Sequence, residues 1–325
     1  MKSILDSKTK YAMSKKETDY FKSILRMTQA ELKDYLASVL AESKYAEIKN
    51  EDGFLYAKGE MPILLVAHLD TVHKAKPAQI SQTGNLLSSP QGIGGDDRCG
   101  VYIITQLLDK KPSVLFCEDE ETGGKGANKF VKTEYAKDLG VKFIVEFDRR
   151  GSSDAVFYNC DNATFEKFVT EKTGFKTSYG TFSDISVLAP NTKIAAVNLS
   201  SGYYREHTAS EEINLEHMMN SVKAGKELID ASVTSDKFEY VARTSYSYYG
   251  SAYDFDDYNY MRSPTKPKRS VKDMTIVVSV RFYNNETGDI DYGYGEGKTK
   301  GDAWFDFFEN NPSVCYDDIQ DCEFE

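Results

Sequence analysis

Histidine and carboxylate side chains recur in this sequence just after apolar segments. Each apolar segment has the character of a buried strand, and the polar residues follow it directly or after a glycine-rich loop. In chain order, the candidates are His68, Asp70, Asp96, Asp97, Glu120, Glu121, Asp148 and His207. Because the carboxyl ends of neighbouring parallel strands meet at one edge of a sheet, we expect these side chains to converge.

Imidazole nitrogens and carboxylate oxygens are common ligands of zinc and similar divalent ions. A set of about five such ligands, with one carboxylate shared, could hold two ions in a single crevice. Two ions together can activate a water molecule and polarise a carbonyl, which is what the hydrolysis of an unactivated amide requires. The residue types therefore predict a metal-dependent hydrolase.

Each motif also has an ordinary explanation. His68 could simply bond a nearby carboxylate at a strand end, and Asp96 with Asp97 could form a turn that caps a helix. The acidic run from Glu118 to Glu121 could be a solvated surface. This last alternative does not explain why the run ends a buried strand and meets glycines.

The elements that must position these residues are visible in the hydrophobic periodicity. Apolar residues at helical spacing predict helices over residues 28–40, 98–109 and 211–230, the first with a capping box of Thr28 and Glu31. Apolar runs predict strands over 53–59, 62–68, 113–120, 142–148 and 194–200. Strands alternating with helices predict an α/β fold with a mixed, largely parallel sheet sandwiched by helices.

The composition changes beyond the last of these helices. We expect a catalytic domain over residues 1–240, a Tyr/Asp/Ser-rich linker over 241–270, and a small acidic α+β domain over 271–325. Residues 235–325 contain 10 Lys and Arg against 18 Asp and Glu, so they carry about −8 of the net charge of −11. A hairpin around residues 284–288 and a short helix over 300–311 are expected in the last domain.

Charge and cysteine usage narrow the functional classes. A net charge of −11 argues against a nucleic-acid binder, because phosphate contacts need surplus Lys and Arg. Five widely spaced cysteines, an odd number, indicate reduced thiols, and no apolar run is long enough to cross a membrane. We therefore expect a cytoplasmic protein with no membrane or nucleic-acid partner.

The motifs HLDTV, GGDDRCG and EDEETGGKGA, with His207 followed by Glu211, resemble the di-zinc exopeptidase superfamily. This superfamily includes peptidase T, carboxypeptidase-G-like peptidases, bacterial leucine aminopeptidases and the tetrahedral aminopeptidases. The resemblance covers roughly residues 15–233. It implies that two divalent ions are bound, with zinc expected and cobalt or manganese as alternatives.

The resemblance also implies a role for each residue. One ion would be held by His68 and Asp148, the other by Glu121 and His207, and Asp96 would bridge them beside a cis peptide to Asp97. Glu120 would be the base that activates a water between the ions. Asp70 would orient His68 through its other ring nitrogen.

Two departures from the superfamily limit what it implies. Peptidase T and its relatives insert a lid domain between the aspartate ligand and the last histidine, but only 58 residues separate Asp148 from His207 here. The tetrahedral aminopeptidases insert a domain between the first histidine and the bridging aspartate, and the stretch from His68 to Asp96 is equally short. Substrate preference and oligomeric state therefore do not carry over, and an oligomer stays open.

Other polar residues near the motifs have less defined roles. His73 is expected to serve its loop rather than the substrate, and Asp184 either caps a helix or lies near the site. Arg149 and Arg150 could bind a substrate carboxylate, although ion pairs are the commoner fate of such residues.

We therefore expect an aminopeptidase or di/tripeptidase that acts on a small peptide or amino-acid amide. An amidohydrolase that deacylates N-acyl amino acids is the alternative on the same site. A binding protein that uses the acidic C-terminal domain is the alternative from another class.

Overall fold

The computed structural model describes residues 13–243 and, further along, residues 276–284, 289–297, 307, 310–311, 314 and 319–324. The chain divides into two compact units, Met1–Arg243 and Thr244–Glu325. Beyond residue 243, the expected linker lies outside the described residues.

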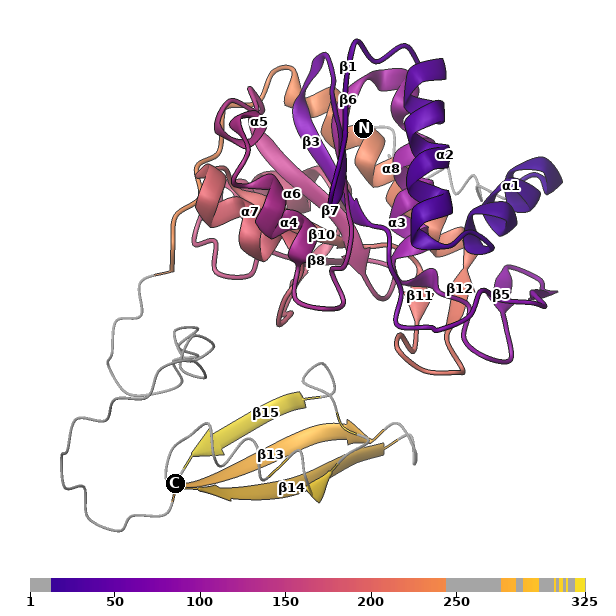
Figure 1. The fold of residues 1–325 in the computed structure, drawn as a ribbon. Coiled ribbons are helices and arrows are strands. Elements are labelled where there is room, and N and C mark those ends of the chain that lie inside the picture. Colours follow the sequence, from indigo (N-terminus) through magenta and orange to yellow (C-terminus); the bar gives the residue numbers. More distant parts are fainter. Residues whose placement is uncertain are drawn as a thin grey trace, which may run out of the picture. The chain divides into compact units, whose positions relative to one another are not determined.

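The first unit is built on an eight-stranded sheet in the order β1-β2-β6-β3-β7-β10-β8-β9 (Figure 1). Neighbouring strands from β6 through β3 and β7 to β10 run parallel, whereas β1, β2 and β8 join by antiparallel pairing. This confirms the predicted mixed, largely parallel sheet. The strands are β1 Glu47–Glu51, β2 Phe54–Lys58, β3 Met61–His68, β6 Pro112–Cys117, β7 Phe143–Arg149, β8 Asp154–Val156, β9 Lys176–Ser178 and β10 Ala196–Ser200.

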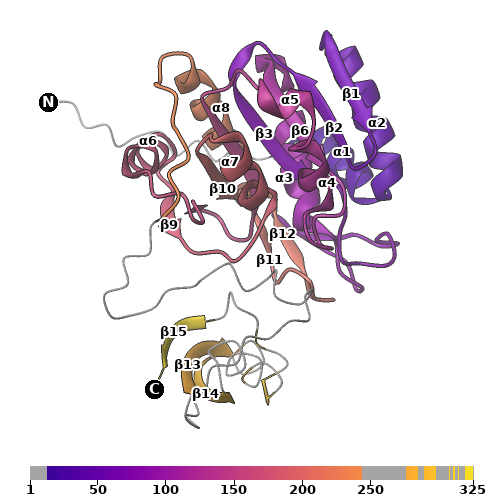
Figure 2. The ribbon, with the colours of Figure 1, turned by 60° about the vertical axis from the view of Figure 1, so that its left-hand side comes forward.

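Helices cover both faces of this sheet (Figure 2), and an apolar cluster lies between the sheet and the helices on each face. The central strands contribute side chains to both clusters, since Leu65 of β3 belongs to one and Leu64 to the other. One cluster is covered by α1 Lys15–Leu25, α2 Gln29–Glu42, α3 Gly95–Thr105, α6 Ala163–Thr173 and α8 Leu215–Ser232. The other is covered by α4 Lys125–Phe130, α5 Glu134–Lys137 and α7 Asp184–Thr192, and a 3-10 turn, η1, spans Leu108–Lys110.

Two capping boxes mark the N-terminal helices. Thr28 and Glu31 exchange hydrogen bonds at the start of α2, as predicted. Ser14 and Glu17 do the same for α1, a helix that the periodicity analysis did not predict. The apolar face of α2 packs on β1 and β2, whereas that of α1 packs on α3, with Phe21 against Tyr102.

A second, small sheet lies beside the main one, in the order β11-β12-β5-β4. Its strands are β4 Ser81–Thr83, β5 Leu86–Ser88, β11 Tyr203–Tyr204 and β12 Glu212–Asn214. The pairing of Ile213 with Leu87 ties together two segments that are more than a hundred residues apart. None of these strands was predicted, because each has only two or three residues and shows no usable alternation.

The second unit contains a three-stranded antiparallel sheet in the order β14-β13-β15. Its strands are β13 Ile276–Asn284, β14 Asp289–Gly297 and β15 Ile319–Phe324, so the predicted hairpin is confirmed. Val278, Val280 and Phe282 alternate along β13 and are buried. Most of the helix expected over 300–311 lies outside the described residues.

Among the helices that could be searched in the described chain, none has the length and apolar character to span a bilayer.

Candidate metal centre

Three candidate segments leave adjacent strands of the main sheet. His68 is the last residue of β3, which lies between β6 and β7. Glu120 and Glu121 follow β6, and Asp148 is near the end of β7. These strands run parallel, so the side chains emerge at one edge, as the sequence predicted.

The other two candidates lie beside the small sheet and do not follow strands of the main sheet directly. Asp96 lies at the start of α3, after a loop that begins at β5. His207 lies in the loop between β11 and β12. Because β5 pairs with β12, the small sheet brings both loops to the edge of the main sheet.

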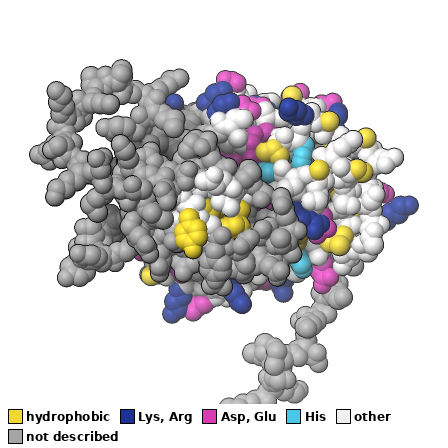
Figure 3. Space-filling model, turned by 90° about the horizontal axis from the view of Figure 1, so that it is seen from below, with side chains coloured by type: hydrophobic (Ala, Val, Ile, Leu, Met, Phe, Trp, Pro, Cys, Tyr) yellow, Lys and Arg dark blue, Asp and Glu magenta, His cyan; other side chains and the backbone are white. Residues whose placement is uncertain are grey.

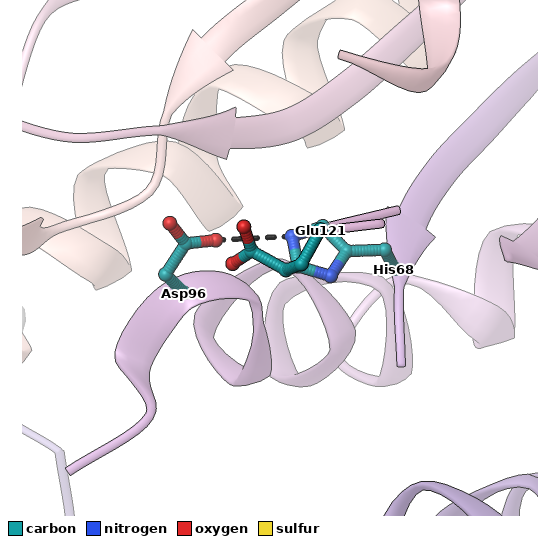
Figure 4. Close-up of side chains that lie close together, drawn as sticks. All are labelled: His68, Asp96 and Glu121. Atoms are coloured by element: carbon teal, nitrogen blue, oxygen red, sulfur yellow. Dashed lines mark hydrogen bonds and ion pairs between the residues drawn. The ribbon is translucent and has the colours of Figure 1, made fainter. Parts of the chain in front are cut away.

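Asp96 is the centre of the cluster. Its Oδ1 lies 3.0 Å from Nε2 of His68, as Figure 4 shows, and its Oδ2 lies 3.3 Å from Nε2 of His207. His68 Nε2 is also 3.5 Å from Oδ1 of Asp148, and His207 Nε2 is 3.0 Å from Oε1 of Glu121. One carboxylate thus presents an oxygen to each of two histidine–carboxylate pairs.

The two pairs differ in exposure. The side chains of His68 and Asp148 are 1% and 8% exposed, whereas that of His207 is 50% exposed. The pair of His68 and Asp148 therefore lies at the buried side of the cluster, and His207 lies at its solvent-exposed side.

Asp70 contacts both His68 and the turn of Glu120 and Glu121. Its Oδ1 lies 3.2 Å from Nδ1 of His68, the nitrogen that faces away from Asp96. The same carboxylate accepts hydrogen bonds from the backbone amides of Glu120 and Glu121, at 3.0 and 3.1 Å. One side chain therefore fixes both the ring of His68 and the turn that carries the two glutamates.

Asp97, the neighbour of Asp96, has a different role in the structure. The peptide bond between Asp96 and Asp97 is cis. Asp97 Oδ1 accepts a hydrogen bond from the amide of Gly100, the position that a helix-capping side chain takes, so the helix-cap explanation holds for this residue. Its oxygens also lie near His68 and Asp148, but the amide contact makes Asp96 the better candidate to bind between the pairs.

Glu120 lies next to this cluster and is buried. Glu120 is 8% exposed, and burial raises the pKa of its carboxyl to about 8, with repulsion from Asp184 and Glu121 in the same direction and attraction to His68 opposing it. A carboxyl group with a pKa near neutrality can both accept and return a proton.

Burial and neighbouring charges shift the pKa values of the clustered side chains. Burial would lower the pKa of His68, but Asp148, Asp70 and Asp96 outweigh it and raise that pKa well above its usual value. Hydrogen bonds to Asp96 and Glu121 raise the pKa of His207 to about 11. Burial, followed by repulsion from Asp96, raises the pKa of Asp148 well above its usual value. Within the described cluster, the carboxylates thus outnumber the two histidines that can balance their charge.

These donors include two groups that could hold a metal ion. His68, Asp96 and Glu121 offer ligand atoms within 4.8 Å of one another, and so do His68, Asp97 and Asp148. Nitrogen and oxygen donors of this kind suit zinc, cobalt and manganese. Positive ions between the pairs would also offset the repulsion described above.

Two residues outside the predicted set hold the Asp96 loop. Glu211 is fully buried and accepts hydrogen bonds from the amides of Gly94 and Asp96, at 2.9 and 3.0 Å. Nε2 of His73 lies 2.6 Å from the same carboxylate. The side chain of His73 therefore contacts the residue that holds the Asp96 loop, rather than a partner in its own loop. Only the spacing of Glu211 after His207 hinted at a role for that residue.

Asp148 has two further partners. The hydroxyl of Tyr203 donates to its Oδ1 at 3.1 Å, and the amide side chain of Asn198 bonds its backbone amide and carbonyl at 2.8 Å each. Neither residue was predicted, because a tyrosine and an asparagine near strand ends carry no distinctive sequence signal.

Three candidates remain. Asp184 lies near the site rather than capping the helix: Ser183 is the cap residue of α7, and the buried carboxyl of Asp184, whose pKa is raised to about 6 by that burial, in turn raises the pKa of Glu120. Arg149 lies 3.7 Å from Asp154, and Arg150 lies 3.0 Å from Glu206. The ion-pair explanation therefore holds for both arginines.

No known protein-family model matches the chain, and no curated protein matches it. Its fold is similar to that of aminopeptidase PepT from Bacillus cereus ATCC 10987 (15% identity, TM-score 0.55, 67% of this chain and 98% of that one). It is also similar to a tripeptidase from Staphylococcus aureus subsp. aureus Mu50 (12%, 0.55, 67% and 98%) and to an aminopeptidase from the archaeon Desulfurococcus kamchatkensis (14%, 0.52, 66% and 95%). The fold is thus the one that the resemblance to zinc exopeptidases implied.

Proposed function

We propose that this protein is a metal-dependent aminopeptidase or di/tripeptidase. The observation that carries the proposal is the position of Asp96, with one oxygen toward each of two histidine–carboxylate pairs and Glu120 beside them. His68 and Asp148 would hold one ion, Glu121 and His207 the other, and Asp96 would be shared. The expected ion is zinc, with cobalt or manganese as alternatives.

Bound ions would supply an acidified water and would polarise the scissile carbonyl. The protein's own groups handle the proton. Glu120 accepts it from the attacking water and returns it to the nitrogen of the leaving amine, which completes the cleavage of the amide bond. Asp70 holds the backbone of Glu120 and the ring of His68 in position during both steps.

The charge of the site favours a peptidase over the deacylase alternative. A peptide with a free amino terminus brings a positive group to a cluster rich in carboxylates. An N-acyl amino acid brings a carboxylate instead, and the nearby cations Arg149 and Arg150 already lie in ion pairs with Asp154 and Glu206. We therefore infer that the substrate carries a free amine.

A panel of amino-acid p-nitroanilides and N-acyl amino acids tests the proposal with the zinc-, cobalt- and manganese-loaded protein. We expect hydrolysis of the anilides and little release from the N-acyl compounds. The reverse preference would establish the deacylase. Hydrolysis of neither class, with a partner captured by the C-terminal unit, would support the binding-protein alternative.

A further inference from the structure

Two large apolar side chains are exposed close to this acidic centre. Val72 is 41% exposed and Phe182 is 39% exposed, whereas most large hydrophobic residues of the described chain are buried. Figure 3 shows hydrophobic side chains beside acidic and histidine side chains on the face seen from below. We call Val72 and Phe182 the apolar rim.

Phe182 lies against the turn that carries the candidate base. A methyl group placed on Gly124 would come within 2.8 Å of Cζ of Phe182, so the ring rests directly on this glycine. Gly124 closes the turn that begins at Glu120, because its amide donates to the Glu120 carbonyl at 2.8 Å. The ring therefore packs against the turn that carries the proposed base.

The backbone around Phe182 is held from both sides. The hydroxyl of Tyr158 donates to the Phe182 carbonyl at 3.3 Å. The next residue, Ser183, is fully buried, donates its hydroxyl to Glu146 and caps α7. An aromatic ring on such a well-anchored backbone offers a binding surface with little ordering cost.

Val72 belongs to another segment that touches the same turn. It lies two residues after Asp70, whose carboxylate accepts hydrogen bonds from the amides of Glu120 and Glu121. Two different segments that contact one acidic turn thus each carry an exposed apolar residue. Exposed apolar surface next to a polar site is the arrangement that recognises a ligand with both characters.

We propose that the apolar rim binds the substrate side chain next to the scissile bond, so that the preferred substrates carry a large apolar residue such as leucine there. This inference rests on the proposed peptidase function. The acidic centre takes the free amine and the carbonyl, and Phe182 contributes apolar contact that glycine-type substrates cannot use.

The test compares kcat/KM for leucine and glycine p-nitroanilides in the metal-loaded full chain. We expect Phe182→Ala to lower the leucine-to-glycine ratio about tenfold, mainly through the leucine substrate. Phe182→Leu should keep most of the ratio. Tyr179→Ala is the matched control, since this aromatic residue of the same segment is 84% exposed and its ring stands in solvent. Its ratio should equal that of the unmodified protein.

A ratio that is unchanged in Phe182→Ala would overturn the proposal. Binding of leucine hydroxamate and glycine hydroxamate, measured by calorimetry, separates it from the proposed function. If the protein hydrolyses no amide but prefers leucine hydroxamate, and Phe182→Ala loses that preference, the rim stands and the peptidase assignment fails. Equal affinities for the two hydroxamates in the unmodified protein would reject the rim. If Phe182→Ala fails to fold, the ratio in Val72→Ser decides in its place, with a decrease expected.

Discussion

Glu120 and Glu121 are adjacent in the chain, but their side chains have different surroundings. Glu121 lies 3.0 Å from His207, whereas Glu120 is buried beside Asp184 with a pKa raised to about 8 by that burial. We expect Glu120→Gln to lower kcat by a factor of roughly 100 or more while the metal content stays the same. Glu121→Ala should instead lose one equivalent of metal. Turnover and metal analysis by mass spectrometry on the same samples would check both outcomes.

The control for this pair is Asp119→Asn, which removes a charge from the same acidic run. The Asp119 side chain is 45% exposed, and we expect near-normal turnover and metal content. Equal metal loss in the two glutamate variants would contradict the assigned roles.

The contacts of Asp70 give a second prediction at this scale. Asp70→Asn keeps one accepting oxygen for the backbone amides of Glu120 and Glu121 but places an amide group near Nδ1 of His68. Because this nitrogen would lose its acceptor, we expect the affinity for the ion at His68 to fall about 10- to 100-fold. Competition titration against a chelator measures that affinity. An unchanged dissociation constant would show that Asp70 is only a support for the turn.

At the residue scale, the sequence predicted side chains whose type and position are both distinctive. Asp96 and His68 stood out because carboxylates and histidines after apolar runs are uncommon. Glu211, Tyr203 and Asn198 did not, because each acts through hydrogen bonds to neighbours that are distant in sequence. Such contacts are set by tertiary structure alone.

At the scale of elements, the start of α3 is fitted tightly to β7. A methyl group on Gly100 would lie 2.3 Å from the carbonyl oxygen of Phe147 and 2.4 Å from Oδ2 of Asp97. By helix propensity alone, Gly100→Ala would stabilise the protein by about 1 kcal/mol. We expect the opposite sign, a loss of about 1–3 kcal/mol, because backbone atoms of β7 must move. Urea unfolding measures it, and a stabilised variant would show that the close approach has been overestimated.

The elements themselves were predictable where their pattern is long. The strands β2, β3, β6, β7 and β10 and the helices α2, α3 and α8 all have extended apolar patterns and were predicted. α1 was not predicted, although Ser14 and Glu17 form a capping box at its start. The short strands β11 and β12 gain their stability from pairing with each other and with β5, which no local pattern encodes.

At the scale of the whole molecule, the two apolar clusters of the first unit draw on residues between Phe21 and Phe238. We therefore expect a chain that ends at Arg243 to unfold in one cooperative transition and to bind as much metal as the full chain. Calorimetry and metal analysis of both forms would check this. Aggregation of the shortened chain, or loss of its metal, would show that the C-terminal unit contributes to the stability of the first.

The last prediction concerns the energy of the assembled site. Carboxylates from three parts of the chain, Asp96, Glu121 and Asp148, lie around His68 and His207, and burial, followed by repulsion from Asp96, disfavours the charged form of Asp148 in the folded protein. Ions that bind only the folded site stabilise it by about 4 kcal/mol at a thousand times the dissociation constant. For a unit of this size we therefore expect zinc to raise the Tm by roughly 8 °C or more above its value in a chelator. His68→Ala should lose most of this increase, because the variant lacks the nitrogen that faces both Asp96 and Asp148. The same Tm in zinc, cobalt, manganese and chelator would mean that these side chains are an ion-paired cluster, and the proposed function would fall with the metal site.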